Sequence, residues 1–531
     1  MADIVVYGGS FSAAAAAAKA ASHAPTKKVA VIIPDPVSST GSSFGSIGTI
    51  GGQNCFDVRN WKGSNPVQGT FSWWFSRWGQ FYSTDLMAAQ LKNDVTKYAN
   101  VEVYYGYDIK SFSALSSPYR ITQVTICSIS RNSTGVVVWG NSTATVTGSV
   151  FIDASDDGRL ARMANFSGTV GRYDWPAQYL DVDERGINGK ARQQAATLMF
   201  KVKGVQYGAA GNMTWGCPSG VQYCCGGWDE YKTDPAILAF NKTYGPKGYA
   251  LKPMNAAQDG AGSDEWWINA LLVFNVDGRA YNRDKGTSIF PADMRPDYRT
   301  VDDAWVEARN LIKNTPAFIN AFRKFPGFSQ AQLVLDSAGN PVVGTVMYLR
   351  ETIHMTKDTT AIANGTEDTN YQLTAIACNK AGATPTTGQD TANYKTRIGL
   401  NYYWSDINAY QFKDLMDASG AYIWGAEIED KLRPDMGVTG STPANPVYVP
   451  YLAITTGYVC NLLVPGYAAG MSSFAWAEGR VIPNLCVLGD AAGIAAAYAV
   501  NNGKHPRNFT DTDIAAIQGT LKKDCLTRLD K

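Results

Sequence analysis

A group of small residues near the start of the chain has the composition of a phosphate-binding turn. The segment VVYGGSFSA leads from a β-branched run into Gly8, Gly9, Ser10 and Ala13. In the dinucleotide-binding pattern, three glycines allow a tight turn, close approach of the backbone to a diphosphate, and close packing of the following helix. Ser10 and Ala13 take the second and third glycine positions here. Since Gly9 restores backbone access and Ser10 can donate a hydrogen bond to phosphate, we predict that the turn binds a dinucleotide.

The elements that must position this turn form a strand, a helix and a second strand. An alanine-rich helix follows the turn, and its N-terminal amides favour an anion. The run KKVAVIIPDP then predicts a second, parallel strand. A carboxylate at the end of that strand normally binds the adenosine ribose. Ile33 takes the usual acidic position, so we assign this role to Asp35 or to the backbone of Pro34.

The remaining segments indicate an α/β fold of more than one domain, as expected for 531 residues. We predict a Rossmann-type dinucleotide-binding domain assembled from the discontinuous segments 1–165 and 446–531, with a β-meander at about 119–147. The last segment contains an expected strand that leads into Gly489 and a second alanine-rich helix. Longer loops and many aromatic residues at 166–445 indicate a mixed α+β substrate or cap domain.

The charge balance of the chain disfavours polyanionic partners. The formal net charge is +1 and charged residues make up 18% of the sequence, so we expect neither nucleic acid nor an anionic membrane as a partner. We expect no membrane span, and the first strand begins too early to leave room for a signal peptide. The compartment stays open, because the chain would also fit the mature form of a secreted protein.

The cysteine pattern leaves two alternatives open. Nine cysteines are present, and Cys217, Cys224 and Cys225 lie close together in the sequence. Their spacing fits no common zinc pattern, so we expect either free thiols or one disulfide from Cys217 to Cys224 or Cys225, and we predict no metal site.

Five segments taken together resemble the FAD-dependent oxidoreductases of the glutathione-reductase-like class. In chain order they are VVYGGSFSA, FGSIGTIGG, IDASDDGRLA, RETIHM, and NLLVPGY with LGDAAGIAAA. The third corresponds to IDATGDGDLA in the family. The resemblance spans nearly the whole chain, and it implies an enzyme that uses FAD as its cofactor.

The resemblance also assigns cofactor contacts residue by residue. A helix N-terminus at the pyrimidine end of the flavin would stabilise the negative charge that develops there on reduction. The implied contacts are Gly8, Gly9, Ser10, Phe11, Ser12 and Ala13 at the diphosphate, Pro34 and Asp35 at the ribose, Ile109 at adenine through its backbone, Gly45, Ser46, Ile47 and Thr49 along the flavin, Ala154 and Asp157 closing the site, Gly489 and Asp490 at the ribityl side, and Ala492, Gly493 and Ile494 at the pyrimidine end.

The catalytic expectations follow from the flavin. Removing hydride from an alcohol or amine needs a base, and of three histidines His354 lies in a segment whose family counterpart approaches the flavin. Arg350 and Tyr402 are candidates for facing the substrate. The low charge, 14 Trp and 28 Tyr fit a neutral hydroxylated small molecule, such as a carbohydrate stacked on aromatic rings, although packing is the more common role of such residues.

Two alternative functions remain. No second strand-glycine-helix fingerprint occurs in mid-chain, which favours a substrate oxidase or dehydrogenase over a pyridine-nucleotide reductase. The electron acceptor stays open, with O2 among the candidates. The alternatives are a flavin reductase supplied with NAD(P)H and a non-catalytic binding protein that keeps the FAD fold.

Overall fold

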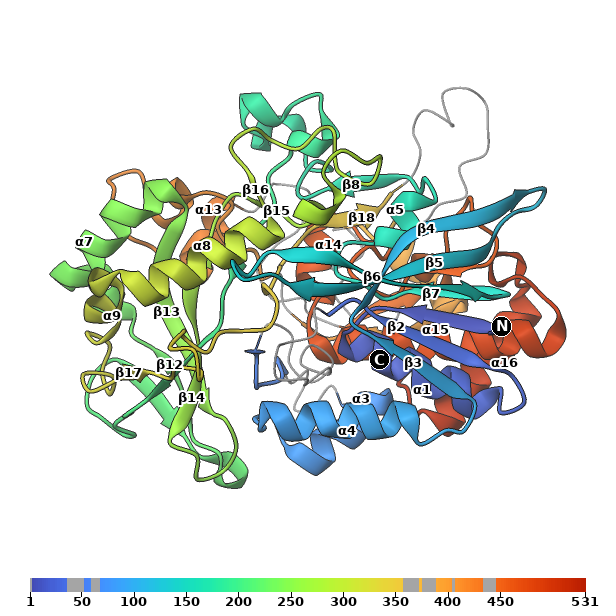
Figure 1. Cartoon of the computed structure of the whole chain (residues 1–531), viewed down its shortest axis with the longest axis horizontal. Coiled ribbons are helices and arrows are strands. Elements are labelled where there is room, and N and C mark those ends of the chain that lie inside the picture. Colours follow the sequence, from blue (N-terminus) through green and yellow to red (C-terminus); the bar gives the residue numbers. More distant parts are fainter. Residues whose placement is uncertain are drawn as a thin grey trace.

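A five-stranded parallel sheet forms the centre of the molecule (Figure 1). The computed structural model describes residues 2–35, 52–58, 67–356, 372–374, 388–403, 406–432 and 446–531. Within these residues the strand order is β21-β7-β1-β2-β3. The strands are β1 Ile4–Tyr7, β2 Val29–Ile33, β3 Val101–Tyr105, β7 Val150–Asp153 and β21 Leu462–Leu463. β1, β2 and β7 are buried at every position, which is typical of a parallel sheet covered on both faces.

The two faces of the sheet contact different layers because side chains alternate along each strand. In β1, Ile4 and Val6 pack with the alanines of helix α1, Phe11–His23. Val5 and Tyr7 pack on the opposite side with residues of an antiparallel sheet. The strand–helix–strand unit expected at the start of the chain is therefore present, with β1 and β2 parallel and in direct register.

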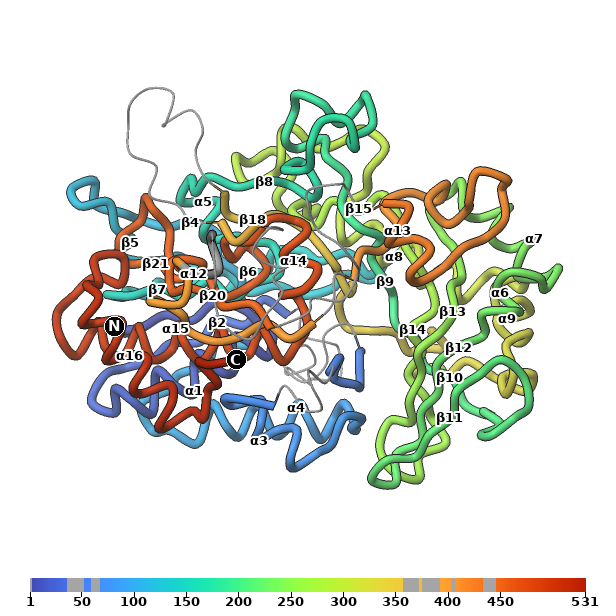
Figure 2. The backbone as a smooth tube through the Cα atoms, turned by 180° about the vertical axis from the view of Figure 1, so that it is seen from behind, coloured from blue at the N-terminus to red at the C-terminus, as the bar shows by residue number. Residues whose placement is uncertain are grey.

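Helix α15, Ile482–Asn502, near the C-terminus, packs against α1, and the two helices lie side by side in Figure 2. A Cβ on Gly493 would lie 2.4 Å from the carbonyl oxygen of Ala16, so only glycine permits this approach. α15 is long and apolar enough to span a membrane by length and composition, but 94% of its most apolar window is buried inside the structure. Burial against α1 explains its composition as that of a core helix.

The strand expected before Gly489 is wrong, because residues 482–502 form one continuous helix. Pro483 occupies the first turn, where proline favours helix initiation. Almost every side chain of the first four turns is buried. A segment that is apolar on all sides gives no helical periodicity, so its sequence pattern resembled that of a buried strand.

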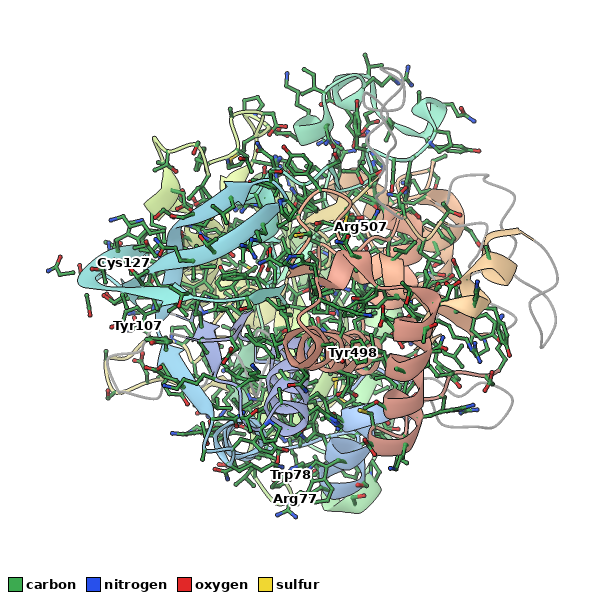
Figure 3. The ribbon with its side chains drawn as sticks, turned by 90° about the vertical axis from the view of Figure 1, so that its right-hand side faces the viewer. Arg77, Trp78, Tyr107, Cys127, Tyr498 and Arg507 are labelled. Carbon is green, nitrogen blue, oxygen red and sulfur yellow. The ribbon has the colours of Figure 1, made fainter. Side chains whose placement is uncertain are left out.

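The antiparallel sheet on the other face begins earlier than the expected meander at 119–147. Its strands are β4 Tyr107–Ser116, β5 Tyr119–Arg131 and β6 Val137–Thr147. Gly106, at φ 65°, separates β4 from β3 and turns the chain from one sheet into the other. In Figure 3 the labels of Tyr107, on β4, and Cys127, on β5, locate this sheet.

A second, mostly antiparallel sheet lies apart from the first, on the left in Figure 1. Helices α7, α8 and α9 flank it. Its path is β11-β12-β13-β14-β10-β17, and β9 pairs with β14. The bounds are β9 Ala196–Thr197, β10 Phe200–Lys203, β11 Met213–Gly216, β12 Tyr223–Gly226, β13 Tyr249–Gln258, β14 Glu265–Val273, β17 Gln332–Leu333, α7 Pro235–Tyr244, α8 Val301–Asn314 and α9 Pro316–Phe322.

The remaining elements connect the two sheets or cover their edges. One of them, β19, packs on α15, where a Cβ on Gly399 would lie 2.1 Å from Val487. Part of the region expected in the substrate domain therefore lies against the FAD-binding side, and the boundaries at 165 and 445 stay a prediction. These elements are α3 Gly69–Trp78, α4 Thr84–Thr96, α5 Arg159–Met163, β8 Gly168–Val170, α6 Trp228–Thr233, β15 Val276–Asp277, β16 Arg299–Thr300, β18 Ile353–Met355, α12 Gly388–Lys395, β19 Arg397–Asn401, α13 Ala426–Leu432, β20 Val447–Pro450, α14 Ser473–Gly479 and α16 Asp511–Asp524.

Candidate functional site

The carboxyl ends of β1, β2 and β7 open onto one cavity. In parallel α/β sheets this edge is the usual ligand-binding edge. Five residues predicted to contact the cofactor line the cavity together: Gly9, Ser10, Pro34, Asp35 and Asp157. Its other lining residues are Tyr7, Arg131, Val137, Ser155, Asp156, Tyr281, Arg283, Val301, Asp302, Trp305, Val346, Met347 and Leu349.

The turn after β1 depends on a glycine at position 8. Gly8 has φ +138°, and a Cβ there would lie 2.6 Å from the carbonyl oxygen of Ala154. The strand ends of β1 and β7 thus come into backbone contact at this point. Gly8 and Ala154 shape the floor of the site by this contact, since neither lines the cavity itself.

The N-terminus of α1 faces the same edge. Ser10 is its N-cap: its hydroxyl accepts a hydrogen bond from the Ala13 amide at 3.4 Å and donates one to Ala154 O at 3.2 Å. The hydroxyl is therefore engaged within the protein, contrary to the expectation that it donates to phosphate. The amides of the first turn, at Phe11 and Ser12, have no acceptor inside the helix and can hold an anion.

The side chains of the first turn of α1 serve the core. Phe11 packs edge-on against Phe56 and Trp74, with ring centroids 5.7 and 5.6 Å apart. The Ser12 hydroxyl donates to Pro465 O at 3.0 Å. Phe11, Ser12 and Ala13 can therefore contact a cofactor only through their backbone.

Four carboxylates, Asp35, Asp156, Asp157 and Asp302, line the cavity. Asp157 is held by Arg162 at 2.6 Å. Burial, together with repulsion from the neighbouring Asp157 and Asp35, raises the pKa of Asp156 to about 7. Asp156 stands where the family pattern has glycine, so this chain adds an acid to its dinucleotide cavity.

The adenine contact assigned to Ile109 stays a prediction, and Ile109 does not line the cavity. The Ile109 amide donates to Asp108 Oδ1 at 2.7 Å, and its carbonyl accepts from Arg159 Nε at 2.9 Å. Arg159 also binds Asp284 at 2.6 and 2.8 Å, and Arg283 pairs with Asp108. The backbone of Ile109 thus takes part in this buried ion network.

The position assigned to Gly489 and Asp490 is wrong. Both lie inside α15, two turns beyond its start. Asp490 Oδ2 accepts the Thr70 amide at 2.7 Å and Oδ1 accepts the Thr70 hydroxyl at 2.5 Å, so the carboxylate caps the first turn of α3. The amides of Ala492, Gly493 and Ile494 lie in the middle of the helix, where they bond to preceding carbonyls and not to a ligand.

The strand end that approaches the site is that of β21. Beyond Leu463 the chain turns at Pro465 and Gly466, where a Cβ on Gly466 would lie 2.5 Å from Ser155 O. The Tyr467 amide donates to the same oxygen at 3.1 Å. The sequence signal for this turn was the Pro-Gly pair after the apolar run NLLV.

A larger cavity, of about 660 Å³, lies between the second sheet and residues 53–58, the short blue segment between the two sheets in Figure 1. Its volume is in the range of small-molecule sites. It is lined by Gln53, Asn54, Cys55, Phe56, Asp57, Val58, Gln80, Phe81, Met199, Tyr223, Cys224, Cys225, Trp228, Lys252, Pro253, Asn255, Ala256, Trp267, Asn269, Tyr348, Arg350, Tyr403, Asp406, Ile407, Asn408, Trp424, Gly425, Ala426, Ile428 and Glu429.

One short segment separates the two cavities. Met347 and Leu349 line the dinucleotide cavity, whereas Tyr348 and Arg350 line the larger one. Arg350 is therefore placed as expected for a residue that faces a substrate. Its Nη2 donates to Thr197 Oγ1 at 3.3 Å, and its Nε has no acceptor among the described residues.

The other two catalytic candidates line neither cavity. His354 is fully buried, with Nδ1 3.1 Å from Tyr467 O and Nε2 3.6 Å from Glu351 Oε1. Tyr402 packs with Leu400 and Tyr448, and its neighbour in sequence, Tyr403, is the tyrosine that reaches the large cavity. Backbone alternation in this short segment explains the one-residue difference.

Two further predictions concern the cysteine cluster and the flavin contacts at residues 45–49. Cys217, Cys224 and Cys225 are free thiols, so of the two alternatives left open the structure has no disulfide here. Gly45, Ser46, Ile47 and Thr49 lie outside the residues that the structure describes.

Among the residues that the structure describes, one group of acids lies close enough to hold a cation: Asp181, Asp183 and Glu184. Arginines already neutralise it, since Arg172 binds Glu184 at 2.6 Å and Arg192 binds Asp183 at 3.0 Å. We therefore assign no metal to this group.

The geometry at the carboxyl edge defines the class of protein. A parallel sheet, a glycine that admits close backbone contact, and a helix N-terminus at the same edge are the features of a Rossmann-type dinucleotide-binding fold. These features fit the diphosphate of FAD. The chain belongs to the FAD dependent oxidoreductase family, whose model matches residues 3–521. It is an FAD-dependent oxidoreductase, and bound FAD supplies the redox chemistry.

Comparison with known proteins adds distant structural likenesses. The search of curated proteins found no match. The chain is similar to CabE, an aromatic hydroxylase from angucycline biosynthesis, at 9% identity and TM-score 0.29, covering 67% of this chain and 54% of that chain. It is similar to glycerol-3-phosphate dehydrogenase from Bacillus halodurans complexed with FAD, at 9% identity and TM-score 0.29, covering 67% and 58%. It is also similar to p-nitrophenol 4-monooxygenase PnpA from Pseudomonas putida DLL-E4, at 8% identity and TM-score 0.28, covering 67% of this chain and 69% of that chain.

Proposed function

We propose that this enzyme removes hydride from a neutral, hydroxylated small molecule bound in the 660 Å³ cavity and transfers it to FAD. The observation that carries the proposal is the single segment between the two cavities. Met347 and Leu349 face the dinucleotide side and Tyr348 and Arg350 face the larger cavity, so one peptide segment separates the sites. A substrate in the larger cavity would lie within one side-chain layer of the cofactor side.

The lining of the larger cavity supports a neutral polar substrate. Aromatic faces at Trp267 and Trp424 offer stacking surfaces for a sugar or an aromatic ring. Side-chain amides at Asn255 and Asn269 offer both donors and acceptors, as hydroxyl groups require. Acidic and basic side chains both line the cavity, so no single charge dominates it.

Arg350 would orient the substrate. Its guanidinium is 5% exposed, and the Nε that lacks an acceptor belongs to a side chain that lines the cavity. A buried N–H without a partner costs free energy, and a substrate oxygen would satisfy it. This arrangement supports binding of a hydroxyl or carbonyl oxygen at Arg350.

Anaerobic reduction of the bound flavin tests the function. The FAD-loaded enzyme is mixed without oxygen with glucose, galactose, glycerol, benzyl alcohol or benzylamine, and the flavin absorbance is followed. We expect bleaching by at least one hydroxylated compound and a slower rate for Arg350→Gln. Bleaching by NADPH alone would instead indicate a flavin reductase, and no bleaching by any compound would indicate a binding protein. Admission of air to the bleached enzyme then tests O2 as the acceptor.

A further inference from the structure

Lys252 lies at an irregularity in the middle of the second sheet. The register of β13 with β14 shifts between Leu251 and Asn255, and Lys252 and Pro253 fall within that break. β-bulges occur frequently next to active sites, where they redirect a side chain. Both residues line the 660 Å³ cavity, and Lys252 is only 2% exposed.

The hydrogen bonds of Lys252 match those of a neutral amine. Its Nζ donates to Asn269 O at 2.8 Å and to Pro253 O at 3.1 Å. A neutral amine has two N–H donors and one lone pair, whereas an ammonium has three donors and no lone pair. The two carbonyls satisfy both donors of the neutral form, and the lone pair remains to accept a proton.

The surroundings of Lys252 also favour the neutral form. No acid of the described residues forms an ion pair with it, and the one contact that favours the ammonium form is the Trp424 ring, whose centroid lies 5.5 Å from Nζ. Burial, and to a smaller extent the nearby Arg350, lower its pKa to about 7, against the opposite effects of Asp406, Asp57 and Cys55. Asp406 is itself paired with Arg480. Glu429 is the remaining acid of the cavity lining.

Lys201 in the same sheet shows the opposite arrangement. It lies on β10 and binds Asp259 at 2.7 Å and Glu265 at 2.9 Å. These two acids raise the pKa of Lys201 despite its partial burial. Lys252 has no such carboxylate partner among the described residues. The two lysines of this sheet therefore differ because of their immediate surroundings.

We propose that Lys252 is the catalytic proton acceptor for substrate oxidation, a role that rests on the function proposed above. The substrate O–H bond breaks and its proton moves to the lone pair of Nζ. The O–H electron pair forms the new carbon–oxygen double bond, and the carbon-bound hydrogen leaves with two electrons as hydride to FAD. The alcohol is oxidised to a carbonyl compound, FAD is reduced, and Lys252 ends as the ammonium.

Chemical labelling tests the protonation state of Lys252 without any substrate. The FAD-loaded protein is treated briefly with acetic anhydride over pH 5.5–11, and mass spectrometry gives the labelling rate of each lysine. We expect the Lys252 rate to titrate with a midpoint near pH 7, and Lys203, an exposed lysine on β10, serves as the internal reference for the labelling reaction. A Lys252 midpoint near 10 would overturn the proposal, whatever the substrate screen shows.

Two substitutions then distinguish a role of Lys252 as proton acceptor from a role as a positive charge. Lys252→Met removes the amine, and Lys252→Arg keeps a cation that cannot deprotonate. With a compound that bleaches the wild-type flavin, we expect the reduction rate to rise with pH to a plateau above about pH 7. We expect both variants to lose this rise and to react at least 100-fold more slowly. Lys203→Met, the matched control, should behave as wild type.

The possible outcomes test the role of Lys252 as a base separately from the proposed substrate oxidation. A rate that falls as pH rises, or a Lys252→Arg variant as fast as wild type, would show that Lys252 acts as a cation and would overturn its role as base. If no compound bleaches the flavin while the labelling midpoint is near 7, the proposed oxidation fails, and with it the catalytic role of Lys252. Flavin absorbance and thermal unfolding of each variant verify that it is folded.

Discussion

Gly489 of α15 lies directly against Ser12 of α1: a Cβ on Gly489 would be 2.3 Å from the Ser12 carbonyl oxygen. The same Ser12 bonds through its hydroxyl to Pro465 at the end of β21. The first helix therefore holds two separate parts of the C-terminal segment. This contact closes the core behind the dinucleotide turn.

Replacement of Gly489 by alanine tests this helix contact. The new methyl group would meet a backbone oxygen that cannot move without shifting α1, so we expect Gly489→Ala to lower the free energy of unfolding by about 1–3 kcal/mol. Gly519→Ala in α16 is the control, since a Cβ there has nothing within 4 Å. Alanine should stabilise that exposed helix by up to about 1 kcal/mol. Urea unfolding measures both, and equal effects would contradict the close contact.

We expect Asp490 to contribute to the stability of the fold and not to FAD binding. Asp490→Ala leaves the Thr70 amide and hydroxyl without their acceptor, so we expect a loss of about 1–3 kcal/mol in the free energy of unfolding. We expect the flavin content of the purified variant to equal that of the wild type. A folded variant that has lost FAD would restore the cofactor role expected from the sequence.

Helix α1 could be predicted from the sequence, whereas the start of helix α15 could not. The turn at Gly8 and the helix from Phe11 were predictable, because a β-branched strand, a glycine and an alanine run have distinct local patterns. The segment LCVLGDAAG was not, since it is buried on all sides and so carries no periodicity. Its small residues serve helix packing, which depends on a partner far away in the sequence.

The acidic group at the dinucleotide cavity should make FAD affinity depend on pH. Asp156 is mostly neutral below about pH 7 and ionised above it. An ionised carboxylate repels a diphosphate, so we expect FAD to bind several-fold more weakly at pH 8 than at pH 6, a change on the order of 1 kcal/mol. Asp156→Asn should bind more tightly at pH 8 and lose most of this dependence.

Titration of FAD into the unloaded protein, followed by flavin fluorescence, measures this effect. Asp229→Asn, at an exposed position on α6, is the control and should match the wild type. The same shift also affects folding: the folded state holds a proton on Asp156 between its ordinary pKa and about 7, so this carboxyl reduces stability as pH rises through that window. An affinity that rises with pH would contradict this account.

His354 should act through structure and not through proton transfer. It is fully buried and bonded to Tyr467 O, and it lines neither cavity. We expect His354→Gln to lower the free energy of unfolding by about 1–3 kcal/mol and to leave the pH profile of flavin reduction unchanged. If the folded, FAD-loaded variant is not reduced while Lys252→Met still is, His354 is the base after all.

The catalytic residues were the hardest part to derive from the sequence. Arg350 lies in a segment that carries a family motif and lines the 660 Å³ cavity, and its contact with a substrate stays a prediction. His354 was favoured because histidine titrates near neutral pH without help. Lys252 reaches the same range only through burial at a β-bulge, and burial is a tertiary property. Its weak sequence signal was a lysine followed by proline inside an apolar strand, KPM.

The position of the flavin ring in an experimental structure of the FAD complex is the most direct test of the central claim, that substrate is oxidised in the 660 Å³ cavity. We predict diphosphate density at the N-terminus of α1, next to Gly9 and Ser10, and a flavin ring that borders the cavity lined by Arg350 and Lys252. A flavin ring enclosed elsewhere, with no face toward that cavity, would contradict the account.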